Sequence, residues 1–208
     1  MKITPGPAII SLLIGYLFGC IQTAYLLGKL FGKIDIRRHG SGNAGASNVT
    51  AMMGMKFGAI TALIDILKGT AAVLAVKAIY PGQPEPAYIA GIGAILGHIF
   101  PFYMNFHGGK GVAALVGMMF GFDWRLGVFF VLLVAIPAVL TDYIVSGSFT
   151  TYIALPIVTL LYGYHWIYLV IAISMTVLCF YKHRANIRRI IDKTETKISS
   201  VIPYRKAK

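Results

Sequence analysis

The sequence predicts an all-helical integral membrane protein, and three observations point to this class. Hydrophobic residues make up 57% of the 208 residues, and charged residues only 12%, about half of the share that a soluble domain carries. The mean hydropathy is +0.74. The apolar residues form long runs separated by short segments rich in glycine, proline and charge. This composition excludes intrinsic disorder, a secreted disulfide scaffold and an ordinary soluble domain that binds nucleic acid.

The first three apolar runs are each about as long as a membrane span, which needs about 20 mostly apolar residues. Ala8–Phe31 stays apolar up to a polar, basic segment that begins at Gly32. Phe57–Tyr80 ends at a proline-rich turn, residues 81–86, which separates it from Ala87–Tyr103. We expect one helix for each of these runs.

The fourth run, Val112–Phe122, has only 11 residues, too few for a hydrocarbon layer of about 30 Å at about 1.5 Å per residue. We still expect it to cross, because otherwise the basic tail would leave on the opposite side. Three further spans are expected at Leu126–Leu140, Phe149–Tyr162 and Trp166–Tyr181, followed by a basic cytoplasmic tail, residues 183–208. The prediction is one membrane-embedded domain, residues 1–208, with about seven spans.

The distribution of positive charge predicts the orientation, because lysine and arginine concentrate in cytoplasmic segments. With seven crossings and the N-terminus outside, 15 of the 19 lysines and arginines lie inside, and Lys2 and Arg125 lie outside. The remaining two, Lys68 and Lys77, fall within a span. We therefore expect an inner-membrane protein with a cytoplasmic active face. Its net charge of +12 favours anionic lipids and anionic substrates as partners and, in a membrane chain, does not indicate nucleic acid.

Several kinds of site are not expected. Cys20 and Cys179 both lie in apolar runs and are predicted to be small buried hydrophobic residues. No cluster of histidine, cysteine and carboxylate residues suggests a metal site, and no cofactor is predicted. Neither a Ser-His-Asp arrangement nor a carboxylate pair is visible. The chemistry must therefore suit phosphate anions and a substrate that is already activated.

The first candidate motif is the glycine-rich segment 40–48. It contains a G-x-G-x-x-G pattern, but the strand and βαβ unit of a dinucleotide site are not available in a helical membrane chain. Glycines still allow successive backbone N–H groups to face one anion, and a helix that starts after the loop would add its positive end. The predicted phosphate-binding residues here are Gly40, Ser41, Gly42, Asn43 and Asn48. The alternative is a flexible turn at the membrane surface.

The second candidate motif combines Gly97-His98 and Pro101 with residues 106–113. It is not a Walker A loop, because Lys110 is followed by glycine and not by serine or threonine. The predicted phosphate-binding residues are Gly108, Gly109, Lys110 and Gly111. Alternatively, Lys110 is an ordinary lysine at the membrane surface, and His98 is a structural histidine whose hydrogen bonds are satisfied.

Two further sets of polar residues are candidates. Asp65 and Lys68 lie three apart within a span, so they share a helix face and can pair. Ionisable residues inside a membrane are candidates for function, but a structural ion pair explains them equally well. His183 and Asn186 stand at the start of the basic tail, where the neighbouring arginines are also explained by attraction to anionic lipid.

Together these motifs resemble the bacterial acyl-phosphate:glycerol-3-phosphate acyltransferase family, PlsY. The similar segments are Asp35-Ile36-Arg37 with residues 40–49, Asp65–Gly69, residues 97–113, and His183-Arg184, Asn186-Ile187, Arg189 and Thr194-Glu195. The resemblance implies transfer of a fatty acyl group from acyl phosphate to the 1-hydroxyl of glycerol 3-phosphate. The product would be lysophosphatidic acid, used in phospholipid synthesis. No metal and no acyl-carrier protein are implied.

The resemblance also suggests roles for individual residues. Ser41, Asn43 and the glycine backbone would hold the donor phosphate, Lys110 would supply charge, and His183 and Asn186 would orient the acceptor. We take Lys110, His183 and Asn186 as the catalytic candidates, with three further possible site residues, His98, Ser148 and Glu195. The proton could be accepted by His98, by His183 or by the substrate's own phosphate.

The chain departs from the family pattern at five positions. Ala51 and Asp142 stand where the family usually has arginine, Val145 replaces a serine, Ala114 a threonine and Lys193 a glycine. An arginine at position 51 would be a natural clamp for the acceptor phosphate. Alternatives are therefore a divergent paralogue with another acceptor, a weakened enzyme, a small anion transporter and a membrane scaffold.

Overall fold

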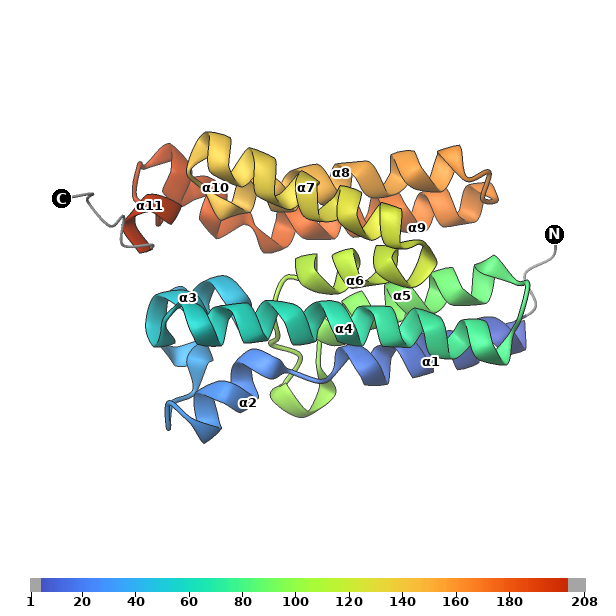
Figure 1. The fold of residues 1–208 in the computed structure, drawn as a ribbon, viewed down its shortest axis with the longest axis horizontal. Coiled ribbons are helices and arrows are strands. Elements are labelled where there is room, and N and C mark those ends of the chain that lie inside the picture. The colour runs from blue at the N-terminus through green and yellow to red at the C-terminus, as the bar shows by residue number, and fades with distance from the viewer. Residues whose placement is uncertain (1–4, 202–208) are drawn as a thin grey trace. The chain divides into compact units, whose positions relative to one another are not determined.

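The computed structural model describes residues 5–201, and all of its regular elements in this range are helices (Figure 1). The chain divides into two compact units, which are residues 1–130 and residues 131–208. In the first unit the helices are α1 (Pro5–Gly19), α2 (Thr23–Leu30), α3 (Ala46–Met53), α4 (Met55–Ile79), α5 (Pro84–Ile99) and α6 (Val112–Phe122). Two short 3₁₀ helices are η1 (Ile36–Arg38) and η2 (Phe102–Met104). Helix α7 (Trp124–Thr141) continues from the first unit into the second.

Helices α1 and α5 approach each other closely because glycines face each other at four-residue spacing. A Cβ atom on Gly15 would lie 1.9 Å from the carbonyl oxygen of Ala90, and one on Gly93 would lie 2.5 Å from that of Leu12. Gly19 and Gly97 repeat this contact one turn later. Small residues at this spacing are the usual means by which membrane helices pack, since lipid provides no hydrophobic driving force between them.

Helix α4 is central to the first unit and contacts α1, α3, α5 and α6. Short α6 lies against its middle, since a Cβ on Gly69 would lie 2.4 Å from the oxygen of Ala114 and one on Gly117 would lie 2.0 Å from that of Ile66. The last carbonyls of α6, those of Gly121 and Phe122, accept hydrogen bonds of 2.8 and 2.9 Å from Lys77 Nζ. The second glycine-rich loop therefore enters α6 beside the middle of α4.

The first span is interrupted, contrary to the single continuous helix expected at Ala8–Phe31. The helical hydrogen bonds stop around Cys20–Gln22, and α2 begins at Thr23. Buried Gln22 donates through Nε2 to the carbonyl oxygens of Gly97 (3.3 Å) and His98 (3.0 Å) on α5. The carbonyls freed at the break accept bonds from other side chains, that of Cys20 from Tyr103 OH at 2.8 Å and that of Ile21 from Lys68 Nζ at 2.5 Å, as backbone buried in a membrane requires.

Helix α5 begins at Pro84, so residues 84–86 are its first turn and not part of the proline-rich turn that the sequence suggested. Proline fits there because the first N–H groups of a helix have no partner within the helix. The remaining boundaries of the first unit agree with the expected spans to within a few residues.

The second unit contains α8 (Ile144–Leu161), α9 (Trp166–Lys182), α10 (Arg184–Ile191) and α11 (Ile198–Val201) as well as most of α7. A bend of 50° separates α9 from α10. The part of the expected tail within the described range is thus partly helical. Arg205, Lys206 and Lys208 of that tail, together with Lys2, lie outside the described residues.

Within residues 5–201, five segments are long and apolar enough to cross a membrane: Pro5–Leu30, Met55–Ile79, Pro84–Met104, Trp124–Thr141 and Ile144–Leu161. The bent pair α9–α10 would be a sixth, and α6 is a shorter apolar helix. Large apolar side chains on these helices face outward, with Val139, Leu140 and Leu161 more than three-quarters exposed. Such extensive exposed apolar surface is suited to lipid and not to water. The chain is therefore a polytopic membrane protein, as predicted.

Candidate functional site

The first candidate loop starts with an ion pair that fixes η1. The Asp35 carboxylate accepts hydrogen bonds from the backbone N–H of Arg37 (3.1 Å) and from its Nε (3.0 Å) and Nη2 (2.8 Å). These bonds lower the pKa of Asp35 to about 2 and raise the pKa of Arg37. Arg37 Nη1 also donates to the Met104 carbonyl at 3.0 Å. One guanidinium therefore joins η1 to η2, the segment that precedes the second loop.

Asn48 holds the rest of the first loop in shape. Its Oδ1 accepts a hydrogen bond of 2.9 Å from the Ser41 backbone N–H, and its Nδ2 donates to the carbonyls of Ile36 (3.0 Å) and His39 (2.9 Å). Asn48 is only 2% exposed. Gly40 has a φ of 58° and lies against Asn48, so that a Cβ there would be 2.3 Å from Oδ1. The loop needs glycine at this position both for the backbone angle and for the contact.

The other polar residues of this motif lie nearer the surface. Ser41 and Ser47 are exposed and Asn43 is half-buried, whereas Asn48 is buried. Gly42 has a φ of 72°, a second left-handed turn within three residues. Ser41 and Asn43 are thus presented by a fixed backbone, while the amide of Asn48 is occupied in holding that backbone.

The second loop returns from η2 to the end of α5. The backbone N–H groups of Gly108 and Gly109 donate to the carbonyls of Ile99 (3.1 Å) and His98 (3.0 Å). A Cβ on Gly109 would lie 2.1 Å from His98 Nε2 and 2.7 Å from the carbonyl oxygen of Ala44. Ala44 belongs to the first loop, so the two glycine-rich loops touch at Gly109.

Lys110 lies directly after this contact and is half-buried. Gly111 follows it with a φ of 81° and is the residue before the first turn of α6. The sequence prediction that this lysine stands between glycines at a helix start is confirmed. A positive side chain and the N-terminal end of a helix together favour an anion.

A buried polar cluster lies next to the second loop. Lys68 Nζ is 2.8 Å from Asp65 Oδ1 and 2.9 Å from His98 Nδ1, and it donates to the carbonyl of Ile21 at 2.5 Å. Thr23 Oγ1 donates to Asp65 Oδ1 at 3.2 Å. The predicted Asp65–Lys68 pair therefore exists, with both side chains 2% exposed. It also includes His98, the histidine that contacts Gly109.

In the second unit, His183 and Asn186 are both buried, at 2% and 7% exposure. His183 Nδ1 is 2.9 Å from the Cys179 carbonyl oxygen, and Asn186 Nδ2 donates to Glu195 Oε1 at 2.6 Å. Glu195 Oε2 accepts a second bond of 2.6 Å from Arg189 Nε. The structure thus brings Asn186 and Glu195 together, two residues that the sequence placed in one motif.

His183 is also held by aromatic packing. Its ring makes an edge contact with Phe149 at 5.4 Å between centroids, and Phe149 stacks on Phe180 at 4.7 Å. Ser148, the neighbour of Phe149, is 7% exposed, and its carbonyl lies 3.9 Å from Cys179 Sγ. Ser148 is therefore near the Cys179 turn that positions His183.

Two departures from the family pattern have a structural explanation. Asp142, where an arginine is usual, accepts hydrogen bonds from Ser199 N (2.9 Å) and Ser199 Oγ (2.6 Å), and these lower its pKa. It thereby attaches the C-terminal segment to the α7–α8 turn. Lys193, where a glycine is usual, has a φ of 56°, a region that glycine adopts readily and other residues seldom do. Ala51 is exposed on α3, and its presence in place of arginine has no structural explanation.

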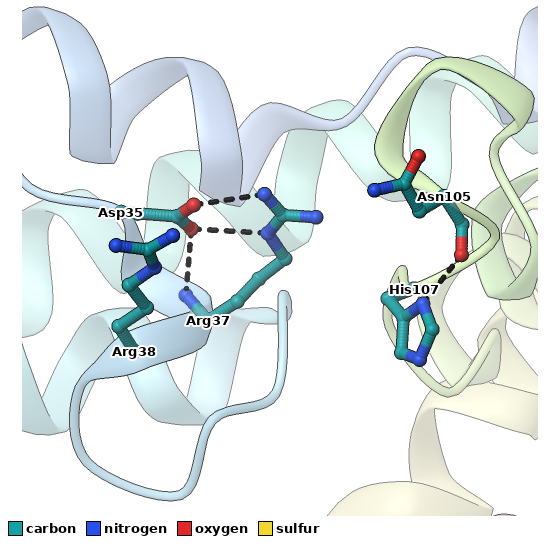
Figure 2. Close-up of a pocket in the computed structure, with 5 residues that line it drawn as sticks. All are labelled: Asp35, Arg37, Arg38, Asn105 and His107. Atoms are coloured by element: carbon teal, nitrogen blue, oxygen red, sulfur yellow. Dashed lines mark hydrogen bonds and ion pairs between the residues drawn. The ribbon is translucent and has the colours of Figure 1, made fainter.

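A pocket of about 300 Å³ opens in the first unit between η1 and the second loop. Figure 2 shows Arg37 and Arg38 on one side and Asn105 and His107 on the other, with Asp35 bound to Arg37. Sequence reasoning did not select Arg38, Asn105 or His107. The available signals were the adjacent arginines of η1 and the polar start of the second loop.

Among residues 5–201, no group of three or more histidine, cysteine and acidic side chains is placed to hold a metal ion. Cys20 and Cys179 are buried free thiols, as the sequence predicted.

Comparison with known proteins identifies the family. The family model described as glycerol-3-phosphate acyltransferase matches residues 9–193. The glycerol-3-phosphate acyltransferase 1 of Oceanobacillus iheyensis is 39% identical over 93% of this chain and 96% of its own length. The glycerol-3-phosphate acyltransferase of a Bradyrhizobium species is 42% identical over 92% of this chain and 95% of its own.

Solved structures agree with the sequence relatives. The crystal structure of PlsY, an integral membrane glycerol 3-phosphate acyltransferase, in its glycerol 3-phosphate form is similar with a TM-score of 0.83 and 31% identity, over 93% of this chain and 96% of that one. The lysophosphatidic acid form gives 0.80 and 30%, with the same coverage. On these matches, and with the glycine-rich loops in place, this chain belongs to the glycerol-3-phosphate acyltransferase family.

Proposed function

We propose that this protein transfers a fatty acyl group from acyl phosphate to the 1-hydroxyl of glycerol 3-phosphate and forms lysophosphatidic acid. The observation that carries the proposal is the contact between the two glycine-rich loops at Gly109 and Ala44, with Lys110 next to it. Relatives with the name of this activity cover nearly the whole chain, and the similar crystal structures are of glycerol 3-phosphate and lysophosphatidic acid forms.

The chemistry needs positioning more than a strong protein nucleophile. Acyl phosphate is a mixed anhydride: the acceptor hydroxyl attacks its carbonyl carbon, the bond from that carbon to the phosphate oxygen breaks, and phosphate leaves. In the proposed roles, Ser41 and Asn43 of the first loop bind the donor phosphate. The backbone N–H groups of Gly42 and Gly45, which the sequence suggested as further donors, already donate to the carbonyls of His39 and Asn43. Lys110 stabilises the negative charge that builds up as phosphate leaves. The rigid Asn48 hydrogen bonds keep these donors in place before the substrate arrives.

The second unit supplies residues suited to the acceptor. We place the proton of His183 on Nδ1, from which it can be donated to the Cys179 carbonyl at 2.9 Å; Cys179 Sγ also lies 3.4 Å from Nδ1. Nε2 is then the basic nitrogen and can accept the proton of a hydroxyl. Asn186 Nδ2 donates to Glu195 Oε1 at 2.6 Å, which fixes the amide, and in the proposed role this amide orients the acceptor. The substrate's own phosphate is the alternative proton acceptor.

We further propose that residues 1–208 form one functional domain in the inner membrane, with the N-terminus outside and the C-terminus and glycine-rich loops facing the cytoplasm. The excess of lysine and arginine on one side supports this orientation. Single cysteines at two exposed positions test it: Ser47→Cys should react with an impermeant thiol reagent only in inverted vesicles, and Gln83→Cys only from outside the cell. The native cysteines are buried. The reverse pattern would contradict the orientation.

The activity itself is tested with purified protein in detergent. The protein is given acyl phosphate with and without glycerol 3-phosphate, and released phosphate and lysophosphatidic acid are measured. Release that depends on glycerol 3-phosphate, with equal amounts of both products, is the expected result. Phosphate release without dependence on this acceptor would indicate a different acceptor, for which the missing arginine at Ala51 is the structural reason. No release would favour a transporter or a scaffold.

A further inference from the structure

The pocket between η1 and the second loop is separate from the residues assigned to acyl transfer. Its lining residues are Asp35, Arg37, Arg38, Asn105 and His107. Four of them lie in the segments that resemble the family motifs, and His107 belongs to the second glycine-rich segment, but none of the five is among the residues proposed to hold the donor phosphate. A volume of about 300 Å³ is at the lower end of the range for small-ligand sites and suits one polar headgroup.

The pocket carries excess positive charge. The only carboxylate in its lining, Asp35, is bound by Arg37 at 2.8 Å, so these two charges compensate each other. Arg38 is exposed, and its guanidinium forms no ion pair or hydrogen bond within the described residues. His107 on the opposite side is also exposed, and its Nδ1 contacts the Asn105 backbone carbonyl, which leaves Nε2 at the other side of the ring. One uncompensated guanidinium and one imidazole thus belong to the same pocket (Figure 2).

The surface around the pocket is aromatic. Phe102, Tyr103 and Phe106, on η2 and the turn after it, are 56%, 47% and 57% exposed. Aromatic side chains beside cationic ones are typical of the boundary between lipid tails and headgroups, where the rings lie at headgroup level and the cations attract anionic lipid. A pocket with this border therefore suits the headgroup of a lipid in the surrounding layer.

We propose that this pocket binds the phosphate group of an anionic phospholipid, with Arg38 and His107 as the side chains that contact it. Arg37, which is bound to Asp35 and to the Met104 carbonyl, forms one fixed wall of the pocket. Because Arg37 also joins η1 to η2, a bound headgroup would hold both glycine-rich loops at their base. The lipid would then stabilise the folded protein by mass action, whether or not it is a substrate.

The test compares the full-length protein in nanodiscs of phosphatidylcholine alone and in nanodiscs that also contain phosphatidylglycerol. Thermal unfolding is measured for the wild type, for the double variant Arg38→Gln/His107→Gln, and for the control Lys56→Gln. Lys56 is exposed in the first turn of α4 and is not in the pocket lining. We expect phosphatidylglycerol to raise the midpoint of the wild type and of the control equally, and the double variant to lose more than half of that rise.

Two outcomes would overturn the proposal. An equal rise in all three proteins would mean that the lipid acts through general surface charge. A rise produced by inorganic phosphate in detergent, equally sensitive to the double variant, would mean that the pocket takes free phosphate and not a lipid. Should the double variant be unstable in phosphatidylcholine, protection of Arg38 from modification by phenylglyoxal, measured on the wild type in both nanodiscs, gives the same answer. No protection by phosphatidylglycerol would then refute binding.

Discussion

The side-chain oxygen of Asn48 accepts a hydrogen bond of 2.9 Å from the backbone N–H of Ser41, seven residues earlier. Since the same side chain also binds the carbonyls of Ile36 and His39, one buried amide determines the path of the whole first loop. The loop that presents Ser41 and Asn43 is therefore rigid because of a residue that need not touch the substrate.

Replacement of Asn48 by alanine should remove this support. Three hydrogen bonds, each with a net value of about 1 kcal/mol, would be lost, and two carbonyls would lose a partner. We expect kcat/KM for acyl transfer to fall roughly a hundredfold, which corresponds to about 3 kcal/mol. Ser47→Ala, on the exposed neighbour, is the control and should retain activity. Similar losses in both variants would argue against a specific role for Asn48.

Lys110→Ala should abolish turnover, because the lysine supplies the only full positive charge that we assign to the leaving phosphate. Removal of one such electrostatic partner typically lowers kcat by about 10²–10³-fold. The assay is phosphate release by the purified variant, with Lys56→Ala as a control for general loss of surface charge. An unchanged rate in Lys110→Ala would remove this residue from the site.

Gly109→Ala should disrupt the contact between the loops. Its Cβ would lie 2.1 Å from His98 Nε2 and 2.7 Å from the Ala44 carbonyl, and backbone cannot move aside as a flexible side chain would. Overpacking of this kind costs about 1–3 kcal/mol, so we expect a lower unfolding midpoint and loss of activity. Gly6→Ala, where a Cβ would meet nothing within 4 Å, should leave both unchanged. A fully active Gly109→Ala variant would contradict the close packing.

The buried ion pair predicts a non-additive effect on stability. Lys68→Met should destabilise by about 3–5 kcal/mol, because the buried Asp65 carboxylate would lose its positively charged partner. The double variant Asp65→Asn/Lys68→Met should recover part of this loss, since no charge is left without its partner. Unfolding of the single and double variants in detergent measures the difference. A double variant less stable than Lys68→Met would refute this account.

Stability should fall in acid through the Asp35–Arg37 pair. The pKa of Asp35 is lowered in the folded protein from 3.8 to about 2, so its contribution is fully present above about pH 4. It should be lost as the pH falls from about 4 to about 2. Unfolding midpoints of the wild type and Asp35→Asn, measured across this range, should differ at neutral pH and converge near pH 2. A difference that does not change with pH would show that the carboxylate charge is not the cause.

Most of the helical layout could be predicted from the sequence, because membrane spans are determined by local apolar length. The position of α6 was predicted to the residue, since glycine and an acidic residue border a short apolar run. The Asp65–Lys68 pair was also predictable from its spacing of three on a helix. In each case the information lies within one segment.

What the sequence did not reveal depends on contacts between distant segments. The break before Thr23 is stabilised by hydrogen bonds from Gln22 to carbonyls of α5. A single glutamine in an apolar run does not by itself predict such a break. The link from Lys68 to His98 joins residues 30 apart. The Asp142–Ser199 contact joins residues 57 apart, so the sequence alone did not show that this aspartate attaches the C-terminal segment.

The shortness of α6 has a consequence for the environment of the reaction. Its 11 residues extend about 16 Å, roughly half of the hydrocarbon layer. Lys77 binds its far end near the end of α4, and Gly69 in the middle of α4 contacts its first turns. The start of α6, which follows Lys110 directly, therefore lies beside the middle of α4 and not beside either of its ends. An acyl phosphate bound by Lys110 would have α4 along one side, which limits the access of water and favours reaction with the hydroxyl delivered to it.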